Sequence, residues 1–270
     1  MKTWLITGTS KGFGRIWAEA ALERGDKVAA TARDKNTLQP LKEKYGDNVL
    51  TLALDVNDRQ ADFEVVKKVR ETFGRIDVVV NNAGYGLFGF VEEVSEQEAR
   101  AQIETNVFGA LWMTQAVLPI MRQQKSGHII QVSSVGGVTA FPGLGLYHAS
   151  KWALEGFSQS LRQEVSDLGI HVTLVEPGGY ATDWAADSSV KSTPIEAYQP
   201  IRDARTKARA QSTPGNPMAT ADGMLDLVDM QDPPLRLMFG KGINELMHAE
   251  YQKRLDEWDR YKDMSEKAQG

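Results

Sequence analysis

The chain contains no cysteine among its 270 residues. This absence excludes disulfide bonds, a thiolate nucleophile and cysteine-ligated zinc. Histidine is also scarce. The four histidines, His128, His148, His171 and His248, show no close metal-ligand spacing, so we expect no metal site.

Long apolar runs and a strong net charge are missing as well. No stretch approaches the roughly 20 apolar residues of a membrane span. Met1-Lys2-Thr3 is followed by only a short apolar run before Thr7, too little for a signal-peptide core. The formal net charge of −5 gives no bulk electrostatic reason to bind nucleic acid or an anionic membrane. We therefore expect a cytoplasmic protein with neither of these partners.

The sequence alternates short apolar runs with longer amphipathic stretches. Candidate strands cover Trp4–Ile6, Val28–Thr31, Val49–Leu54, Asp77–Val80, His128–Val132, His171–Val175 and Leu235–Phe239. Candidate helices run from about Gly14 to Arg24, Asp58 to Phe73, Ser95 to Gln123 and Tyr147 to Asp167. Such alternation favours parallel strands joined by right-handed crossovers. We predict a single α/β domain over residues 1–270, a Rossmann-type doubly wound parallel sheet with helices on both faces.

The pattern changes after Pro177. Residues 181–220 carry several prolines among small and polar residues, which is typical of a substrate lid. Residues 243–270 form a charged C-terminal helical tail in which Tyr251, Leu255 and Trp258 recur at helical spacing. We expect this helix to dock on the body of the protein, the alternative being a helix that binds a partner.

A glycine-rich segment follows the first candidate strand. Its members are Gly8, Ser10, Lys11, Gly12, Phe13 and Gly14. Glycines let the backbone turn tightly and approach a pyrophosphate, while the N-terminus of the next helix offers free N–H groups. The spacing Gly-x-x-x-Gly-x-Gly differs from the common dinucleotide fingerprint. Taken alone, the cluster could equally be a plain turn.

The end of the second strand indicates which nucleotide would bind. NAD-selective sites usually place a carboxylate there to bond the ribose hydroxyls. Here Arg33 stands at that point instead, and its guanidinium can grip a 2′-phosphate in a bidentate fork. Lys11 could add a second positive charge, so we expect NADP(H). The alternative is that both are solvated surface cations.

Tyr147 and Lys151 are four residues apart, which places them on one face of a helix. We expect the lysine cation to lower the pKa of the phenol and bring proton transfer into a useful range. Ser134 follows a candidate strand whose carboxyl end would face the ligand, so its hydroxyl can bond a substrate carbonyl. Asn106 lies in mid-helix, where a buried polar role is plausible. His148 should face away from this site because adjacent helical residues do not share a face.

Seven motifs together resemble the short-chain dehydrogenase/reductase family, in its common single-domain subgroup. The resemblance spans about residues 3–182. The motifs are Thr7-Gly8-x-x-x-Gly12-x-Gly14, Leu54-Asp55-Val56, Asn81-Asn82-Ala83-Gly84, Asn106, Ser134, Tyr147-x-x-x-Lys151 and Pro177-Gly178-Gly179-Tyr180-Ala181-Thr182.

That resemblance implies roles for individual residues. Asp55 would bond the adenine amino group, with the Val56 backbone beside it. The centre of the cofactor would meet Asn82, Ala83 and Gly84. The nicotinamide end would meet Pro177, Gly178, Tyr180 and Thr182. Tyr147 and Lys151 would be both catalytic and cofactor-binding, and Asn106 would anchor a water that links Lys151 to solvent.

The expected activity is an NADP(H)-dependent transfer of hydride between nicotinamide and a ketone, aldehyde or secondary alcohol. Apolar residues flank the catalytic segments and suggest a bulky apolar ketone of the hydroxysteroid kind. They are Tyr85, Phe88, Phe141, Leu144, Leu146, Tyr180 and Trp184. Two alternatives are a non-catalytic NADPH-sensing regulator on the same fold and a sugar-nucleotide epimerase-like enzyme. The resemblance also suggests a homodimer or homotetramer formed through helices near 97–123 and 147–167.

Overall fold

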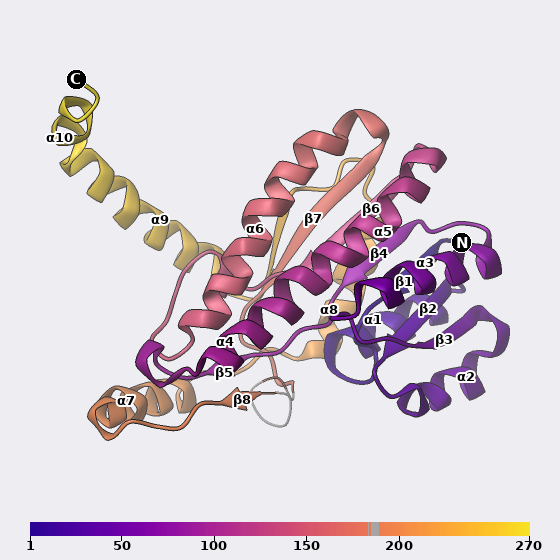
Figure 1. Ribbon diagram of the computed structural model, residues 1–270, viewed down its shortest axis with the longest axis horizontal. Helices are drawn as coiled ribbons and strands as arrows, with labels where there is room; N and C mark the ends of the chain where they lie inside the picture. The colour runs from indigo at the N-terminus through magenta and orange to yellow at the C-terminus, as the bar shows by residue number, and fades with distance from the viewer. Residues whose placement is uncertain (183, 185–188) are drawn as a thin grey trace.

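The computed structural model describes residues 1–182, 184 and 189–270. A seven-stranded sheet has the order β3-β2-β1-β4-β6-β7-β9, and all of its neighbouring strands are parallel (Figure 1). Its strands are β1 Thr3–Ile6, β2 Lys27–Ala32, β3 Val49–Ala53, β4 Val78–Asn81, β6 Gly127–Val132, β7 Ile170–Pro177 and β9 Arg236–Phe239. The predicted Rossmann-type sheet is therefore confirmed.

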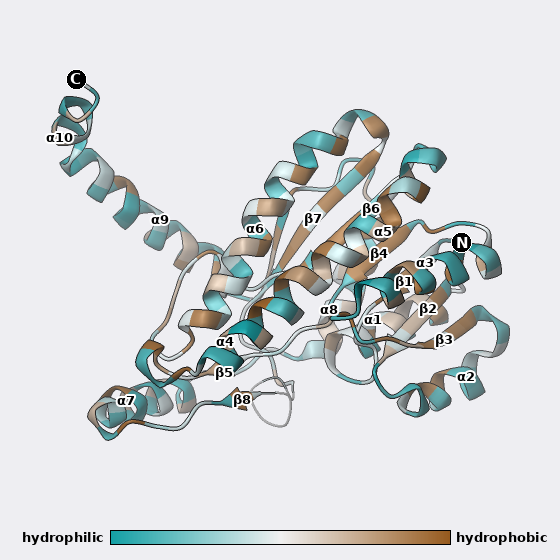
Figure 2. Ribbon diagram, viewed as in Figure 1, coloured by the Kyte–Doolittle hydropathy of each residue, from teal (hydrophilic) through white to brown (hydrophobic). Residues whose placement is uncertain are grey.

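Helices cover both faces of this sheet. The helices are α1 Gly12–Glu23, α2 Gln39–Tyr45, α3 Arg59–Phe73, α4 Glu96–Ile103, α5 Gly109–Gln124, α6 Gly145–Val165, α7 Gln199–Ala210, α8 Thr220–Asp229, α9 Ile243–Arg260 and α10 Lys262–Lys267. One core cluster joins the sheet to α1, α2 and α8, and the other joins it to α3, α5 and α6. Figure 2 shows strands such as β6 and β7 coloured largely as hydrophobic, as expected for a sheet with helices packed on both faces.

The chain reverses direction across the sheet between β1 and β4. It runs outward from β1 through β2 to β3, then returns to place β4 on the other side of β1. The connections that follow β1 and β4 therefore diverge and leave a crevice at the carboxyl ends of the strands, where open α/β sheets bind ligands. The glycine-rich segment follows β1, and Asn82 follows β4.

The long helix predicted from Ser95 to Gln123 is interrupted. Ser95 caps α4 as expected: its hydroxyl accepts a bond from the Glu98 N–H, and the Glu98 carboxylate accepts one from the Ser95 N–H. A π-helical segment, Glu104–Phe108, then separates α4 from α5. Single π-turns of this kind are frequent at functional sites, and this one contains Asn106.

The segments after β7 contain more regular structure than predicted. Val190–Lys191 (β8) pairs with Leu87–Phe88 (β5) in a small second sheet, and α7 follows.

The C-terminal tail is helical as expected, but the expectation that it docks on the body is wrong for most of its length. Met247 is the buried residue of α9, whereas Leu255 and Trp258 are 44% and 62% exposed. Figure 1 shows α9 and α10 projecting from the body. In the part of the chain that is described, no helix combines the length and apolarity needed to cross a membrane.

Candidate active site

The glycine-rich loop makes a tight turn between β1 and α1. Gly8 and Gly12 have φ angles of +70° and +61°, which L side chains rarely adopt. A Cβ on Gly14 would lie 2.5 Å from the Gly8 carbonyl oxygen, so the loop tolerates no side chain there. Beside Gly12, in contrast, nothing lies within 4 Å of the corresponding position. The backbone of this turn is thus open to a ligand at the N-terminus of α1.

Thr7 and Asn82 hold that loop in place. The Thr7 hydroxyl accepts bonds from the backbone N–H groups of Asn82 and Ala83, at 3.0 and 2.9 Å. The Asn82 amide donates to the backbone oxygens of Thr7 and Gly8, at 2.8 and 3.0 Å. The Asn82 side chain therefore braces the cofactor loop. Sequence reasoning missed Thr7, although a threonine directly before the first glycine was the available signal.

The residues expected at the adenine end lie in the segments that follow β1, β2 and β3. Arg33 and Lys11 are exposed, and neither forms an ion pair with any residue that the structure describes. Asp55 is also exposed, and its carboxylate accepts a bond from the Asn57 N–H at 3.0 Å. Val56 is buried against α5, where a Cβ on Gly109 would lie 2.7 Å from it.

Tyr147 and Lys151 lie on the same side of α6. Tyr147 is 6% exposed, and the Lys151 Nζ atom lies 5.8 Å from the centre of its ring. Nζ also donates a 2.7 Å bond to the Val132 carbonyl at the end of β6. Burial raises the pKa of Tyr147 to about 12 and lowers the pKa of Lys151 to about 8. Burial thus outweighs the expected lowering of the phenol pKa, and Tyr147 stays protonated near neutrality.

Ser134 lies just beyond β6, beside the Tyr147 hydroxyl. Its own hydroxyl accepts a 3.0 Å bond from the Gly136 N–H and caps the short turn Val135–Gly137. A hydrogen bond between Ser134 and Tyr147 opposes the effect of burial on the pKa of the phenol. Two hydroxyl groups therefore meet at the carboxyl edge of the sheet, where a carbonyl oxygen could contact both.

Asn106 is 2% exposed and uses its whole side chain on protein groups. Its Nδ2 donates to the Tyr85 carbonyl and to the Ser150 hydroxyl, each at 3.0 Å. Its Oδ1 accepts from the Tyr85 N–H at 3.1 Å. The π-turn thus fixes the loop after β4 against α6. The contact on α6 is Ser150, the residue next to Lys151.

The expectation that His148 faces away from Tyr147 is wrong, because the centres of the two rings lie 5.7 Å apart; His148 is nevertheless buried and structural. Its Nε2 accepts a 3.0 Å bond from the Phe141 N–H, so in a neutral ring Nδ1 carries the proton and donates to the Gly136 carbonyl at 2.9 Å. Burial lowers the pKa of His148, which keeps the ring neutral. The ring therefore ties the loop that contains Ser134 to the start of α6.

Aromatic side chains cover the Tyr147 ring. The Trp184 ring lies 4.9 Å from that of Tyr147 and 5.2 Å from that of Phe88. The structure thus brings these candidate pocket residues together. Of the others, Leu144 is buried, Tyr85, Leu146 and Tyr180 are half-buried, and Phe141 is exposed.

The segment after β7 closes over the glycine-rich loop. The Tyr180 ring packs edge-on against Phe13 at 5.3 Å, and Phe13 stacks on Trp17 of α1. Gly178 donates its N–H to the Phe239 carbonyl at 2.8 Å. Pro177 ends β7, and Thr182 donates its N–H to the Tyr180 carbonyl at 2.9 Å. These contacts place the expected nicotinamide-end residues across the crevice from α1.

The helix α7 is joined to the turn Val91–Glu93 by a buried ion pair. The Arg202 guanidinium lies 2.5 Å from Glu93, whose side chain is 0% exposed. The same carboxylate accepts backbone bonds from Phe90 and Ile195, each at 2.8 Å. The Phe90 ring stacks on Tyr198 at 4.8 Å. These residues carried no motif in the sequence and were not anticipated.

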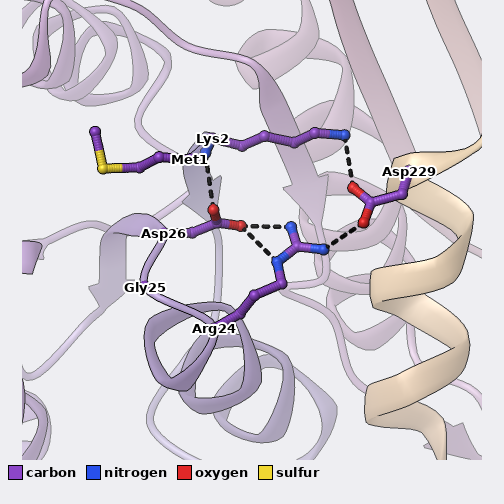
Figure 3. A pocket seen from close by; sticks show the side chains of 6 residues that line it. All are labelled: Met1, Lys2, Arg24, Gly25, Asp26 and Asp229. Carbon is purple, nitrogen blue, oxygen red and sulfur yellow. Dashed lines mark hydrogen bonds and ion pairs between the residues drawn. The ribbon is translucent and has the colours of Figure 1, made fainter.

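A surface hollow lies at the opposite, amino-terminal edge of the sheet (Figure 3). It is lined by Met1, Lys2, Arg24, Gly25, Asp26 and Asp229. Its charged groups satisfy one another: Asp229 lies 2.9 Å from both Lys2 and Arg24, and Arg24 also pairs with Asp26. Arg33 and Lys11, which have no ion-pair partner among the described residues, lie instead at the carboxyl edge, which is the candidate site.

Comparisons with known proteins agree with this geometry. Residues 2–192 match the family model described as short chain dehydrogenase. Oxidoreductase BOA17 of Botryotinia fuckeliana (strain B05.10) is 46% identical over 243 residues, which cover 88% of this chain and 89% of that protein. A short-chain dehydrogenase from Streptomyces avermitilis superposes with a TM-score of 0.92 at 36% identity, covering 99% of this chain and 100% of that one. The closed form of serine dehydrogenase complexed with NADP+ gives a TM-score of 0.76 at 29% identity, covering 88% and 94%.

Proposed function

The chain belongs to the short-chain dehydrogenase/reductase family of oxidoreductases, and from that premise we propose that it is an NADP(H)-dependent carbonyl reductase acting on an apolar ketone. One observation carries this proposal: a protonated tyrosine, a serine hydroxyl and a lysine meet at the carboxyl edge of the sheet, beside a glycine-rich turn. When bound, the reduced nicotinamide supplies the hydride.

The glycine-rich loop suits a dinucleotide. Its turn leaves open space beside Gly12, and its N–H groups lie at the N-terminus of α1, where a pyrophosphate is favoured. Arg33 and Lys11 supply cations without partners among the described residues, which supports a 2′-phosphate and hence NADP(H). The similar serine dehydrogenase binds NADP+. Asp55 and Val56 would flank the adenine.

Tyr147 would donate the proton in the reduction. Because burial keeps its phenol protonated, it enters the reaction in the form that can donate to a developing alkoxide. Ser134 would donate a second hydrogen bond to the same oxygen, stabilising its charge. The opposite direction, oxidation of an alcohol, would need the tyrosinate, which burial disfavours. Reduction is therefore the direction that this arrangement supports.

Lys151 would hold the ribose and stabilise the tyrosinate after proton transfer. One of its three N–H bonds goes to the Val132 carbonyl, which leaves two for other groups. Asn106, whose amide bonds Ser150 next to Lys151, would complete a path to solvent by anchoring a water. Tyr147 would regain its proton by this path.

The pocket favours an apolar substrate. Trp184 packs against the Tyr147 ring and Phe88 packs against Trp184, so aromatic surface would lie close to the reacting group. An apolar ketone would gain burial energy there without leaving polar groups unpaired. We also propose that α7, within the segment 181–220, forms one side of this pocket.

We further propose a homodimer or homotetramer assembled through α4, α5 and α6. Two aromatic side chains in this region are exposed, Phe108 at the end of the π-turn by 38% and Trp152 on α6 by 41%. Large exposed aromatics of this kind are enriched at interfaces. Light scattering after size-exclusion chromatography would measure the assembly, and an aspartate in place of Trp152 should shift it toward the monomer.

A paired assay of NADPH and NADH oxidation over a panel of ketones and aldehydes tests the function. Tyr147→Phe should lower kcat/KM by about 10²- to 10⁴-fold, the usual contribution of a general acid. Tyr251→Phe, an exposed tyrosine on α9, is the matched control and should retain activity. Undiminished turnover in Tyr147→Phe would refute the mechanism. Binding of NADPH without turnover across the panel would favour the regulator instead.

A further inference from the structure

Two buried glutamates lie behind Lys151, and the mechanism above does not use them. Glu155 is one helical turn after Lys151 on α6 and is 7% exposed, and Glu176 in β7 is 0% exposed. Arg236 of β9 reaches both, with its Nε atom 2.8 Å from Glu155 Oε2 and 3.6 Å from Glu176 Oε1. A carboxylate inside the apolar strand β7 was a visible signal in the sequence that went unused.

The cluster holds two carboxyl groups but one guanidinium. Ionising both buried carboxyls side by side is unfavourable, because their charges repel and neither is well solvated. Burial, and next the neighbouring charge of Glu155, raise the pKa of Glu176 to about 8. Near neutral pH Glu176 is therefore the protonated partner, and its O–H can donate to Glu155. The two acids then carry one negative charge between them.

Unpaired polar atoms support a proton within this cluster. Among the residues that the structure describes, neither oxygen of Glu176 has a hydrogen-bond partner, and the same holds for Glu155 Oε1 and the Ser133 hydroxyl. Ser133 Oγ and Glu155 Oε1 converge beneath the backbone of Gly137, where an added Cβ would meet them at 2.6 and 3.2 Å. Buried polar atoms rarely lack hydrogen-bond partners. A proton shared between the two carboxyl groups would provide a hydrogen bond for some of these atoms.

The charge of the pair acts on Lys151. Burial favours loss of the lysine proton, and the negative charge of Glu155 opposes that effect. Glu155 is four residues from Lys151 on the same helix, within the usual range of side-chain interaction. The other charged group against the pair is Arg236, whose side chain is 34% exposed and so is screened by water.

We propose that Glu155 and Glu176 share one proton, and that the single negative charge of this pair keeps the Lys151 ammonium protonated beside Tyr147. The inference rests on the proposed function, in which Lys151 supports proton transfer by Tyr147. Glu155 and Glu176 are positioning residues, because they act on the reaction through Lys151. The pair would extend the working range of the enzyme toward alkaline pH.

The first test needs no cofactor and measures thermal unfolding from pH 5 to pH 9. In the unfolded chain Glu176 ionises near its ordinary pKa, whereas in the folded protein it keeps its proton to higher pH. Its stabilising contribution is therefore lost as the pH rises between these two values. Glu176→Gln should flatten that part of the pH dependence of Tm. Glu164→Gln, at an exposed site on α6, is the control. An unchanged slope in Glu176→Gln would overturn the shared proton.

The second test follows Lys151 itself. Competitive acetylation with acetic anhydride, read by mass spectrometry, gives the pH midpoint at which the Lys151 amine becomes reactive. The midpoint, and with it the alkaline limb of kcat/KM, should move about one pH unit lower in Glu155→Gln/Glu176→Gln, as expected for loss of one nearby charge in a buried site. Glu155→Gln alone should shift it less, because Glu176 can then ionise, and Glu176→Gln should leave it in place.

The outcomes separate the two proposals. Full turnover in Tyr147→Phe would defeat the proposed function. Loss of turnover in Tyr147→Phe, together with an unmoved Lys151 midpoint in the double variant, would defeat the inference alone. If the double variant does not fold, the single variants decide. Equal midpoints in Glu155→Gln and Glu176→Gln would overturn the proposal, because only Glu155 lies next to Lys151.

Discussion

Replacing Asp62 with valine is expected to stabilise the protein, and more strongly at pH 8 than at pH 5. Asp62 lies on α3 and faces the core together with Val65, Val66 and Val69. Its side chain is 0% exposed, and neither carboxylate oxygen has a hydrogen-bond partner in the described part of the chain. An isolated buried carboxyl of this kind is costly once it ionises.

The pKa of Asp62 sets the size of the effect. Burial raises this pKa to about 8, and the charges of Asp58 and Asp55 act in the same direction. Since the folded-state pKa lies above the unfolded value of about 3.9, stability is greatest below pH 4 and falls as the pH rises toward 8. Each pH unit in this interval costs at most about 1.4 kcal/mol, so the cost at pH 7 is at most about 4 kcal/mol.

Chemical denaturation at pH 5, 7 and 8 would measure this cost directly. The difference in unfolding free energy between Asp62→Val and the parent protein should grow with pH, by about 1 kcal/mol or more from pH 5 to pH 7. Asp226→Val on α8 replaces an exposed aspartate and should show no such growth. A constant difference across the three pH values would show that Asp62 ionises at its ordinary pKa and would refute the reasoning.

Three further substitutions test the site. Arg33→Asp should raise KM for NADPH about 10- to 100-fold and change KM for NADH far less, because it replaces a charge-assisted contact with the 2′-phosphate by repulsion. Steady-state kinetics would measure both KM values, and equal changes would overturn the cofactor assignment. Thr7→Val should lower the unfolding free energy by about 2 kcal/mol, because it leaves the N–H groups of Asn82 and Ala83 without their acceptor; an unaltered denaturation midpoint would contradict this. His148→Phe should lower kcat by up to about 100-fold through movement of the adjoining loop; an unaffected kcat would argue against that role.

The sheet could be predicted from the sequence because each parallel strand needs a short run that is apolar on both faces. Val78-Val79-Val80 is such a run, and it forms most of β4. The strand predicted over Leu235–Phe239 is observed as Arg236–Phe239. The proximity of Tyr147 and Lys151 followed equally from their spacing on a helix.

Features set by distant contacts could not be predicted. The π-turn at Asn106 depends on bonds to residues 21 and 44 positions away, which no local pattern reveals. The pKa of Tyr147 depends on how deeply the folded chain buries it. The direction of α9 is set by Gly240 and Gly242, with φ angles of +137° and +77°, so helical periodicity in the tail could not show whether it docks.

The ion pair between Glu93 and Arg202 bears on how a substrate reaches Tyr147. Swinging α7 outward would leave the Glu93 carboxylate in the protein interior without its counter-ion, and it would also part the stacked rings of Phe90 and Tyr198. The helix is therefore better regarded as a fixed wall than as a flap. Selectivity between ketones would then come from the static shape of the entrance. Substitutions along α7 should therefore change which ketones bind, without changing the rate of any opening motion.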